Sequence, residues 1–230
     1  MAGRPALQRR ESLKPDTTAI DIAILPPADV SARAIALNAA LPADESQGLR
    51  LGVDRLPHIT LTQQFVPFES LDPLLAQLDR LERDCEPVPL RVTGGGKGTS
   101  GLSSVWMTIE RTPALANLHA QLLQAAEPFE VATGDASAFF GGDARARDVR
   151  WVSEFRRESS FDRFTPHITL GHAPEPPSVE PMEFVATTIA VCHLGRFCTC
   201  RQIFRAWDLP LPKAQSPEPK AQSARPKPRA

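Results

Sequence analysis

One five-residue segment occurs twice in this chain, and it constrains the fold more than any other feature. Pro57 to Leu61 reads Pro-His-Ile-Thr-Leu, and Pro166 to Leu170 repeats it without change. Polar and apolar residues alternate in both copies, which is typical of a β-strand with one buried face. The exact repetition predicts a duplicated architecture in which two equivalent strands occupy equivalent places.

The alternation also predicts which side chains share a surface. Residues i and i+2 of a strand point to the same face and lie roughly 6.5 Å apart. The first copy therefore presents His58 and Thr60 together, and the second presents His167 and Thr169 together. The isoleucine and leucine of each copy point to the opposite face, toward the core. Two such strands side by side would bring two imidazoles and two hydroxyls to one place.

These four side chains suit phosphoester chemistry without a metal or another cofactor. Histidine titrates near neutral pH, so one ring can be neutral while the other is protonated. The neutral ring of the pair His58 and His167 would take a proton from water or a ribose hydroxyl, and the charged ring would protonate the leaving oxygen. Thr60 and Thr169 would bind the phosphate oxygens. The identical pentapeptides leave open which histidine is the base.

At these residues the chain resembles the 2H phosphoesterase superfamily, which contains the bacterial 2'-5' RNA ligase and cyclic phosphodiesterase enzymes. Segments 56–65 and 164–171 look like its two motif strands, and the order of elements from 18 to 209 is similar to the family's. The resemblance implies an α+β fold of two lobes, with duplicated antiparallel sheets, helices on the outer faces and a central cleft. It also implies hydrolysis of RNA-type 2',3'-cyclic phosphates to 2'-phosphates, or of related 2'-5' phosphodiesters, with ligation as the reverse reaction.

Composition and charge favour one domain with a polar tail at each end. We expect tails at 1–17 and 211–230 around a single domain at 18–210. The tails carry net charges of +2 and +4, which leaves −7 on the rest of the chain. An acidic domain does not favour a broad grip on long nucleic acid. The expected partner is a nucleotide or an RNA end with a cyclic phosphate or a 2'-5' linkage.

No apolar run approaches the length of a membrane span, and the N-terminus lacks the apolar region of a signal peptide. We therefore expect a monomer in the cytoplasm. The remaining sequence predicts helices near 29–41, 70–85 and 113–123, and strands at 18–25, 88–93, 104–110, 151–155, 184–194 and 201–209. The glycine-rich segment 94–101 is expected to be a turn, because Lys97 lacks the following Ser or Thr of a phosphate-binding loop.

Four aromatic residues are possible substrate contacts. Trp106 should share a face with Ser104 and Thr108, where it could stack on a nucleobase or pack under a loop. Phe139 and Phe140 lie in the irregular stretch 127–150, which we interpret as a flap. His172 falls by strand parity on the face opposite His167, so it is left out of the catalytic pair. It stays a phosphate-contact candidate because some members of the similar family carry a basic residue nearby.

Three cysteines, Cys192, Cys198 and Cys200, surround His193 and raise the question of a zinc site. Their spacing is tight for a structural zinc site, so reduced thiols in a sheet are the favoured interpretation.

Other functions also remain open. His58 and His167 could be metal ligands, although the two motif strands supply no acidic residue on the shared face. The chain could also be a nucleotide- or RNA-binding module without turnover, or an enzyme that trims RNA from 3' to 5'.

Overall fold

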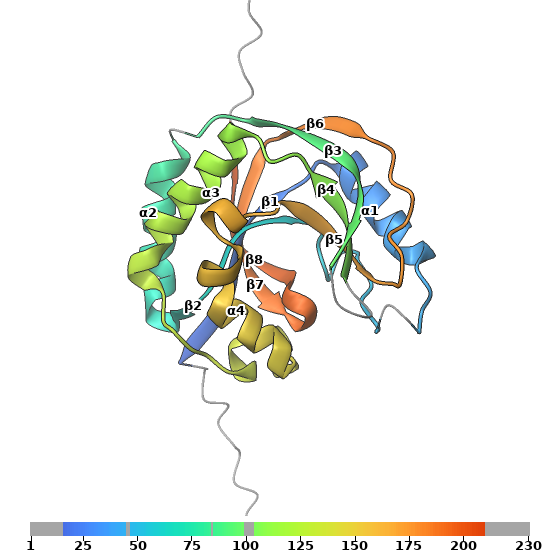
Figure 1. Cartoon of the computed structure of the whole chain (residues 1–230). Helices are drawn as coiled ribbons and strands as arrows, with labels where there is room; N and C mark the ends of the chain where they lie inside the picture. Colours follow the sequence, from blue (N-terminus) through green and yellow to red (C-terminus); the bar gives the residue numbers. More distant parts are fainter. Residues whose placement is uncertain (1–15, 45–46, 84, 99–103, 210–230) are drawn as a thin grey trace, which may run out of the picture.

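All strands named below belong to one antiparallel sheet, which curls strongly from edge to edge (Figure 1). The structure is a computed structural model, and it describes residues 16–44, 47–83, 85–98 and 104–209. The expected tails therefore lie almost wholly outside the described residues. The strands follow the order β6-β3-β4-β5-β2-β1-β7-β8. Their bounds are β1 Thr17–Leu25, β2 Ile59–Pro67, β3 Val88–Lys97, β4 Ser104–Ile109, β5 His167–His172, β6 Met182–Ala186, β7 Thr188–Gly195 and β8 Thr199–Asp208.

The two motif strands, β2 and β5, meet in the middle of this sheet. They are antiparallel neighbours through the register pair Ile59 and Ile168. Each half of the sheet thus contributes four strands, and the two halves that the sequence predicts form one continuous sheet. The α+β fold with antiparallel sheets and outer helices is confirmed.

Three helices cover the outer face of the sheet and enclose the main core (Figure 1). These are α1 Ala28–Ala40, α2 Leu71–Glu82 and α3 Pro113–Ala126. Leucines of α2 and α3 pack there against the isoleucines of β1, all fully or nearly fully buried: Leu74, Leu78, Leu115, Leu122, Ile20, Ile22 and Ile24. A fourth helix, α4 Ala146–Ser159, lies against β2 from the opposite face of the sheet, which we call the site face. No helix among the described residues is long and apolar enough to span a membrane.

A β-bulge interrupts each motif strand at its leucine. Along β1 and β2, Ile22 pairs with Thr62 and the next pair skips Leu61. Along β4 and β5, the pairing skips Leu170 in the same way. A bulge leaves one residue out of the ladder and reverses the parity of everything beyond it. The two copies therefore share an irregularity as well as a sequence.

The carbonyls of both bulged leucines accept hydrogen bonds from buried side chains of the outer helices. Asn38 of α1 donates from Nδ2 to Leu170 O at 2.5 Å, and His119 of α3 bonds through Nδ1 to Leu61 O at 2.5 Å. Asn38 and His119 are each 1% exposed. Each helix thus supports the motif strand of the other half, since α1 connects β1 to β2 whereas α3 precedes β5. His119 is therefore a buried helix residue on the outer side of the sheet, opposite the site face.

Two segments differ from the sequence-based predictions. The strand expected at 151–155 is wrong, because these residues lie inside α4. Asp148, Val152 and Phe155 are its buried residues, and their spacing of four and three is helical. The glycine-rich turn is also partly wrong, because residues 94–97 continue β3, while residues 99–103 lie outside the described part of the chain.

The stretch 127–150 is more regular than the expected flap. It contains the short 3-10 helices η2 Glu127–Phe129, η3 Ala136–Ala138 and η4 Phe140–Gly142 before α4 begins. Phe139 is 2% exposed and packs edge-on against Phe65 of β2, with ring centroids 5.8 Å apart. Phe139 is therefore a core residue, and its prediction as a substrate contact is corrected.

Removing the Asn38 side chain tests the support of the second bulge. Besides Leu170 O, the Asn38 amide donates to Leu49 O at 3.1 Å and accepts from Leu51 N at 2.9 Å. Leu49 O keeps a hydrogen bond from Arg50 Nη1, so Asn38→Ala leaves two buried backbone groups, Leu170 O and Leu51 N, without this partner, at about 1–3 kcal/mol each before relaxation. We expect a loss of about 2–4 kcal/mol in the free energy of unfolding, measured by urea denaturation. The exposed helix residue Gln121 provides the control, since Gln121→Ala should change stability by less than about 0.5 kcal/mol. A loss for Asn38→Ala no larger than this control would contradict the assigned role.

Candidate active site

The two histidines and two threonines of the repeated segments form one patch at the centre of the site face. Ile59 and Ile168 are register partners and both are buried in the main core. The antiparallel register then sets His58 opposite Thr169 and Thr60 opposite His167. Side chains opposite each other in such a pair have Cβ atoms about 4.5–5.5 Å apart. The structure therefore brings together the four residues that the repeat predicts.

Both imidazole rings are anchored in the same way. His58 Nδ1 lies 2.8 Å from Leu56 O, and His167 Nδ1 lies 2.7 Å from Thr165 O. Because a carbonyl only accepts hydrogen bonds, Nδ1 carries the proton in each ring. The neutral form of each ring thus keeps its lone pair on Nε2.

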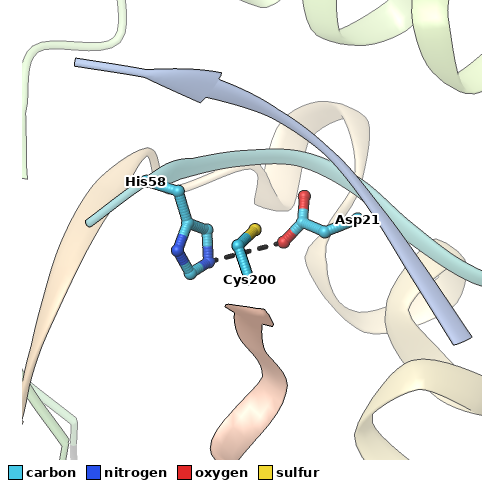
Figure 2. Close-up of side chains that lie close together, drawn as sticks. All are labelled: Asp21, His58 and Cys200. Atoms are coloured by element: carbon cyan, nitrogen blue, oxygen red, sulfur yellow. Dashed lines mark ion pairs between the residues drawn. The ribbon is translucent and has the colours of Figure 1, made fainter. Parts of the chain in front are cut away.

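A buried carboxylate, Asp21 of β1, stands beside the first motif and was missed by sequence reasoning. Its Oδ2 accepts hydrogen bonds from Thr60 Oγ1 and Gln63 Nε2, each at 2.7 Å, and lies 3.5 Å from His58 Nε2 (Figure 2). The Asp21 side chain is fully buried, and its Oδ1 has no partner among the described residues. The expectation that the shared face lacks acidic residues holds for the two motif strands alone, because β1 supplies one. The signal available in the sequence was the position of this acidic residue within an otherwise apolar strand.

The bulges decide which residues join this patch. Gln63 and His172 each follow a motif threonine by three positions, and each returns to the site face because a leucine is skipped. His172 pairs with Ser104 and therefore faces the same side as His167, so the parity argument against it was wrong. Its Nε2 lies 3.4 Å from Arg147 Nη2, which leaves Nδ1 as the protonated nitrogen. That Nδ1 is buried and lacks a partner among the described residues.

Electrostatics distinguish the two halves of the patch. Burial raises the pKa of Asp21, against the opposing influence of His58 and of the hydrogen bonds from Gln63 and Thr60. Surrounding protein atoms desolvate His167 and lower its pKa, and the nearby His58 lowers it further. His167 is therefore readily neutral at pH 7. The repeated sequence is symmetric, but its surroundings are not.

Trp106 lies beside the second motif on the site face. Its ring is 4.9 Å from the His167 ring, at an interplanar angle of 36°. The indole covers Gly96 of β3, where an added Cβ would come within 2.3 Å of Trp106 Nε1. Trp106 thus lies on the face of β4 that the sequence predicts, while its contact with a nucleobase stays a prediction. Phe140 is 36% exposed, lies edge-on to His193 and packs under the Arg201 guanidinium, and its contact with a substrate stays a prediction.

The cysteine cluster does not converge on a site of its own. His193 Nε2 lies 2.9 Å from Ala138 O, and Cys198 Sγ lies 3.8 Å from Asp148 O. Cys192 and Cys200 are both buried and adjoin each other across β7 and β8. All cysteines of the described residues are free thiols. Cys200 instead approaches Asp21 and His58 (Figure 2).

The fold and the central patch define an α+β protein with paired histidine-threonine strands, and the comparisons agree with this class. The family model of the 2'-5' RNA ligase superfamily matches residues 26–191. The chain belongs to this superfamily. A search of curated proteins gives no match.

Solved structures of low sequence identity share the fold. The crystal structure of TT0787 of Thermus thermophilus matches with a TM-score of 0.54 at 20% identity, over 84% of this chain and 98% of that one. E. coli LigT complexed with NADP+ gives 0.51 at 19% identity, and LigT complexed with phosphate gives 0.50 at 20%, with the same coverage. Both are similar in backbone architecture across nearly their whole lengths.

Four buried or partly buried histidines predict how stability depends on pH. Desolvation lowers the pKa of His119, His167, His172 and His193 in the folded chain. The unfolded chain, with histidine pKa values near 6.5, binds more protons as the pH falls past that value. The free energy of unfolding should therefore decrease from pH 7.5 to pH 5.5, as measured by urea denaturation.

Asp21 contributes with the opposite sign, because a raised carboxyl pKa makes the folded chain bind the extra proton. Acidification should thus destabilise Asp21→Asn more than the original chain, over the pH range in which Asp21 takes up its proton. Stability that stays constant or increases on acidification would contradict the assignment of neutral, desolvated histidines.

Proposed function

We propose that this chain is a metal-independent phosphodiesterase that hydrolyses RNA-type 2',3'-cyclic phosphates to 2'-phosphates, or related 2'-5' phosphodiesters. The observation that carries the proposal is the pairing of β2 with β5, which puts two Nδ1-anchored histidines and two threonines on one face. The superfamily match supports phosphoester chemistry in general. E. coli LigT has been crystallised with phosphate, which supports an anion site on this fold.

The surroundings of the two rings support different roles for them. His167 has a lowered pKa and a free Nε2 lone pair, which suits the general base that accepts a proton from the attacking water. His58 Nε2 faces the Asp21 carboxylate at 3.5 Å. The two groups form an ion pair when His58 carries a proton on Nε2, and a ring in that state suits the general acid.

The reaction then balances over the two rings. Water attacks phosphorus and loses a proton to His167 Nε2, the bond from phosphorus to the 3' oxygen breaks, and that oxygen takes the proton from His58. The product carries a 2'-phosphate. Return of a proton from His167 to the His58–Asp21 pair through solvent restores the resting state.

The two threonines differ in whether their hydroxyl groups already donate a hydrogen bond within the protein. Thr169 Oγ1 has no hydrogen-bond partner among the described residues, so it is the better placed donor to a phosphate oxygen. Thr60 Oγ1 donates to Asp21 and reaches a phosphate oxygen only by exchanging this bond for one to the substrate. A proton on His58 offsets the charge of Asp21 beside the phosphate.

Substitution of the motif residues tests the chemistry. His58→Ala and His167→Ala should each lower kcat by a factor of about 100 or more, because each removes one proton-transfer group. Thr169→Ala should raise the transition-state barrier by about 2–4 kcal/mol, as for a lost oxyanion donor. Thr93→Ala, on the exposed part of β3, is the matched control and should retain the original rate. Equal activity of the His167→Ala variant would rule out the proposed base.

A substrate panel tests the reaction itself. The purified chain is incubated with 2',3'-cyclic mononucleotides, cyclic-phosphate RNA ends, 2'-5'-linked dinucleotides and 3'-5' RNA, in the presence of EDTA. We expect turnover of the cyclic or the 2'-5' substrates that EDTA does not reduce, with the product isomer identified by chromatography. Tight binding without product, or activity that EDTA abolishes, would contradict the proposal.

A further inference from the structure

Three possible metal ligands from three strands converge at the first motif. Asp21 of β1, His58 next to the start of β2, and Cys200 of β8 each place one ligand atom within 4.8 Å of the other two (Figure 2). All three side chains are buried. Within the described residues, no other three potential ligands meet this criterion. Carboxylate, imidazole and thiolate are all ligands that Zn²⁺ accepts.

From this geometry we infer that Asp21, His58 and Cys200 form a site for a thiophilic divalent cation such as Zn²⁺, and that occupation of the site blocks catalysis. Three protein ligands and one open position are the usual arrangement of an accessible zinc site. The binding part of the inference stands on geometry alone, while the block of catalysis rests on the proposed function. The metal is therefore an inhibitor of the site and not a cofactor of the reaction.

The orientation of His58 fits a metal ligand. Its Nδ1 donates to Leu56 O, so the Nε2 lone pair points at the Asp21 carboxylate. A backbone carbonyl that accepts the other ring hydrogen is the usual partner of a ligating histidine. The 3.5 Å between Nε2 and Oδ2 is close to the separation of two ligand atoms around one zinc ion, which ligand distances of about 2.0–2.2 Å produce.

The surroundings hold the other two ligands in place. Thr60 and Gln63 donate to Asp21 Oδ2 and fix the carboxylate, while Asp21 Oδ1 lacks a partner among the described residues. Leu56 N donates to Cys200 O at 2.9 Å, and Leu56 O accepts from His58 Nδ1. The Leu56 backbone therefore links the cysteine to the histidine. These contacts bring the ligands near one another before any metal arrives. A shift of about 1 Å at Cys200 suffices to reach coordination distance.

Binding exchanges protons for the cation. Coordination deprotonates the Cys200 thiol and displaces the proton that His58 Nε2 carries when it pairs with Asp21, and both protons leave to solvent. His58 Nε2 is then bonded to the metal and cannot protonate a leaving oxygen. We therefore predict that EDTA leaves the activity of the chain unchanged and that zinc inhibits it.

Spectroscopy with cobalt tests binding without any substrate. The full chain, freed of metal by EDTA and dialysis, is titrated with Co²⁺ and then with Zn²⁺. We expect one equivalent of Co²⁺ to give the near-ultraviolet absorption of a thiolate–cobalt bond and Zn²⁺ to displace it. Cys200→Ala should lose this absorption and bind Zn²⁺ at least about 100-fold more weakly.

Two further variants separate ligation from loss of structure. Cys198→Ala, which removes a neighbouring thiol outside the three ligands, should keep the absorption and the affinity. Asp21→Asn should keep the absorption at saturating Co²⁺ but weaken Zn²⁺ binding, because the thiolate remains and a charged oxygen is lost. Absence of the absorption in the original chain, or its persistence in Cys200→Ala, would overturn the inference.

The kinetic experiment uses the substrate of the panel that the chain turns over fastest. One equivalent of Zn²⁺ should suppress turnover of the original chain, and EDTA should restore it, whereas Cys200→Ala should keep its own metal-free rate. Activation by zinc would overturn the inhibitory role. If no substrate is turned over, the proposed function fails while the cobalt titration still decides the metal site.

Discussion

An extra leucine in each motif strand is the constraint on which the candidate site depends. Skipping Leu61 and Leu170 releases their carbonyls from the ladder inside a closely packed core. A buried carbonyl without a partner costs about 1–3 kcal/mol, so each bulge persists only with a donor beneath it. Asn38 and His119 provide these donors. The bulges then return Gln63 and His172 to the site face, beside the motif histidines and threonines.

The crossed support of the two halves links the motifs mechanically. Helix α1 holds the bulge of β5, and α3 holds the bulge of β2, so neither motif is positioned by its own half alone. His119 extends the link, because its ring stacks on Phe164 at 4.0 Å and its Nε2 accepts from Phe161 N at 3.0 Å, just before the second motif. Each motif strand thus depends on a helix of the other half for one buried hydrogen bond.

The sequence predicted the repeated strands, the shared face of the four motif residues and the fold class, because a strand's period of two translates directly into geometry. It could not predict His172's side, since a bulge changes parity without any local signal beyond Gly171, whose φ is +153°. Nor could it place Asp21, which comes from β1 and meets the motif only through sheet pairing. The stretch 151–155 was misassigned because a short apolar alternation suits either a strand or one face of a helix.

Asymmetry around a symmetric repeat supports the different tasks that we propose for the two histidines. The bulge register makes Asp21 the counterpart of Ser104, since they pair with Gln63 and His172 respectively. The first half therefore holds a carboxylate where the second half holds a hydroxyl. A carboxylate beside a phosphate site is unfavourable unless it is neutralised, and burial makes Asp21 depend on a positive neighbour. In the proposed mechanism a proton on His58 meets this need and makes that ring the acid. A metal ion held with Cys200 would also neutralise the Asp21 carboxylate, but it would occupy His58 Nε2 and remove that acid. Whether a proton or a metal ion is bound thus determines whether His58 can act as the acid.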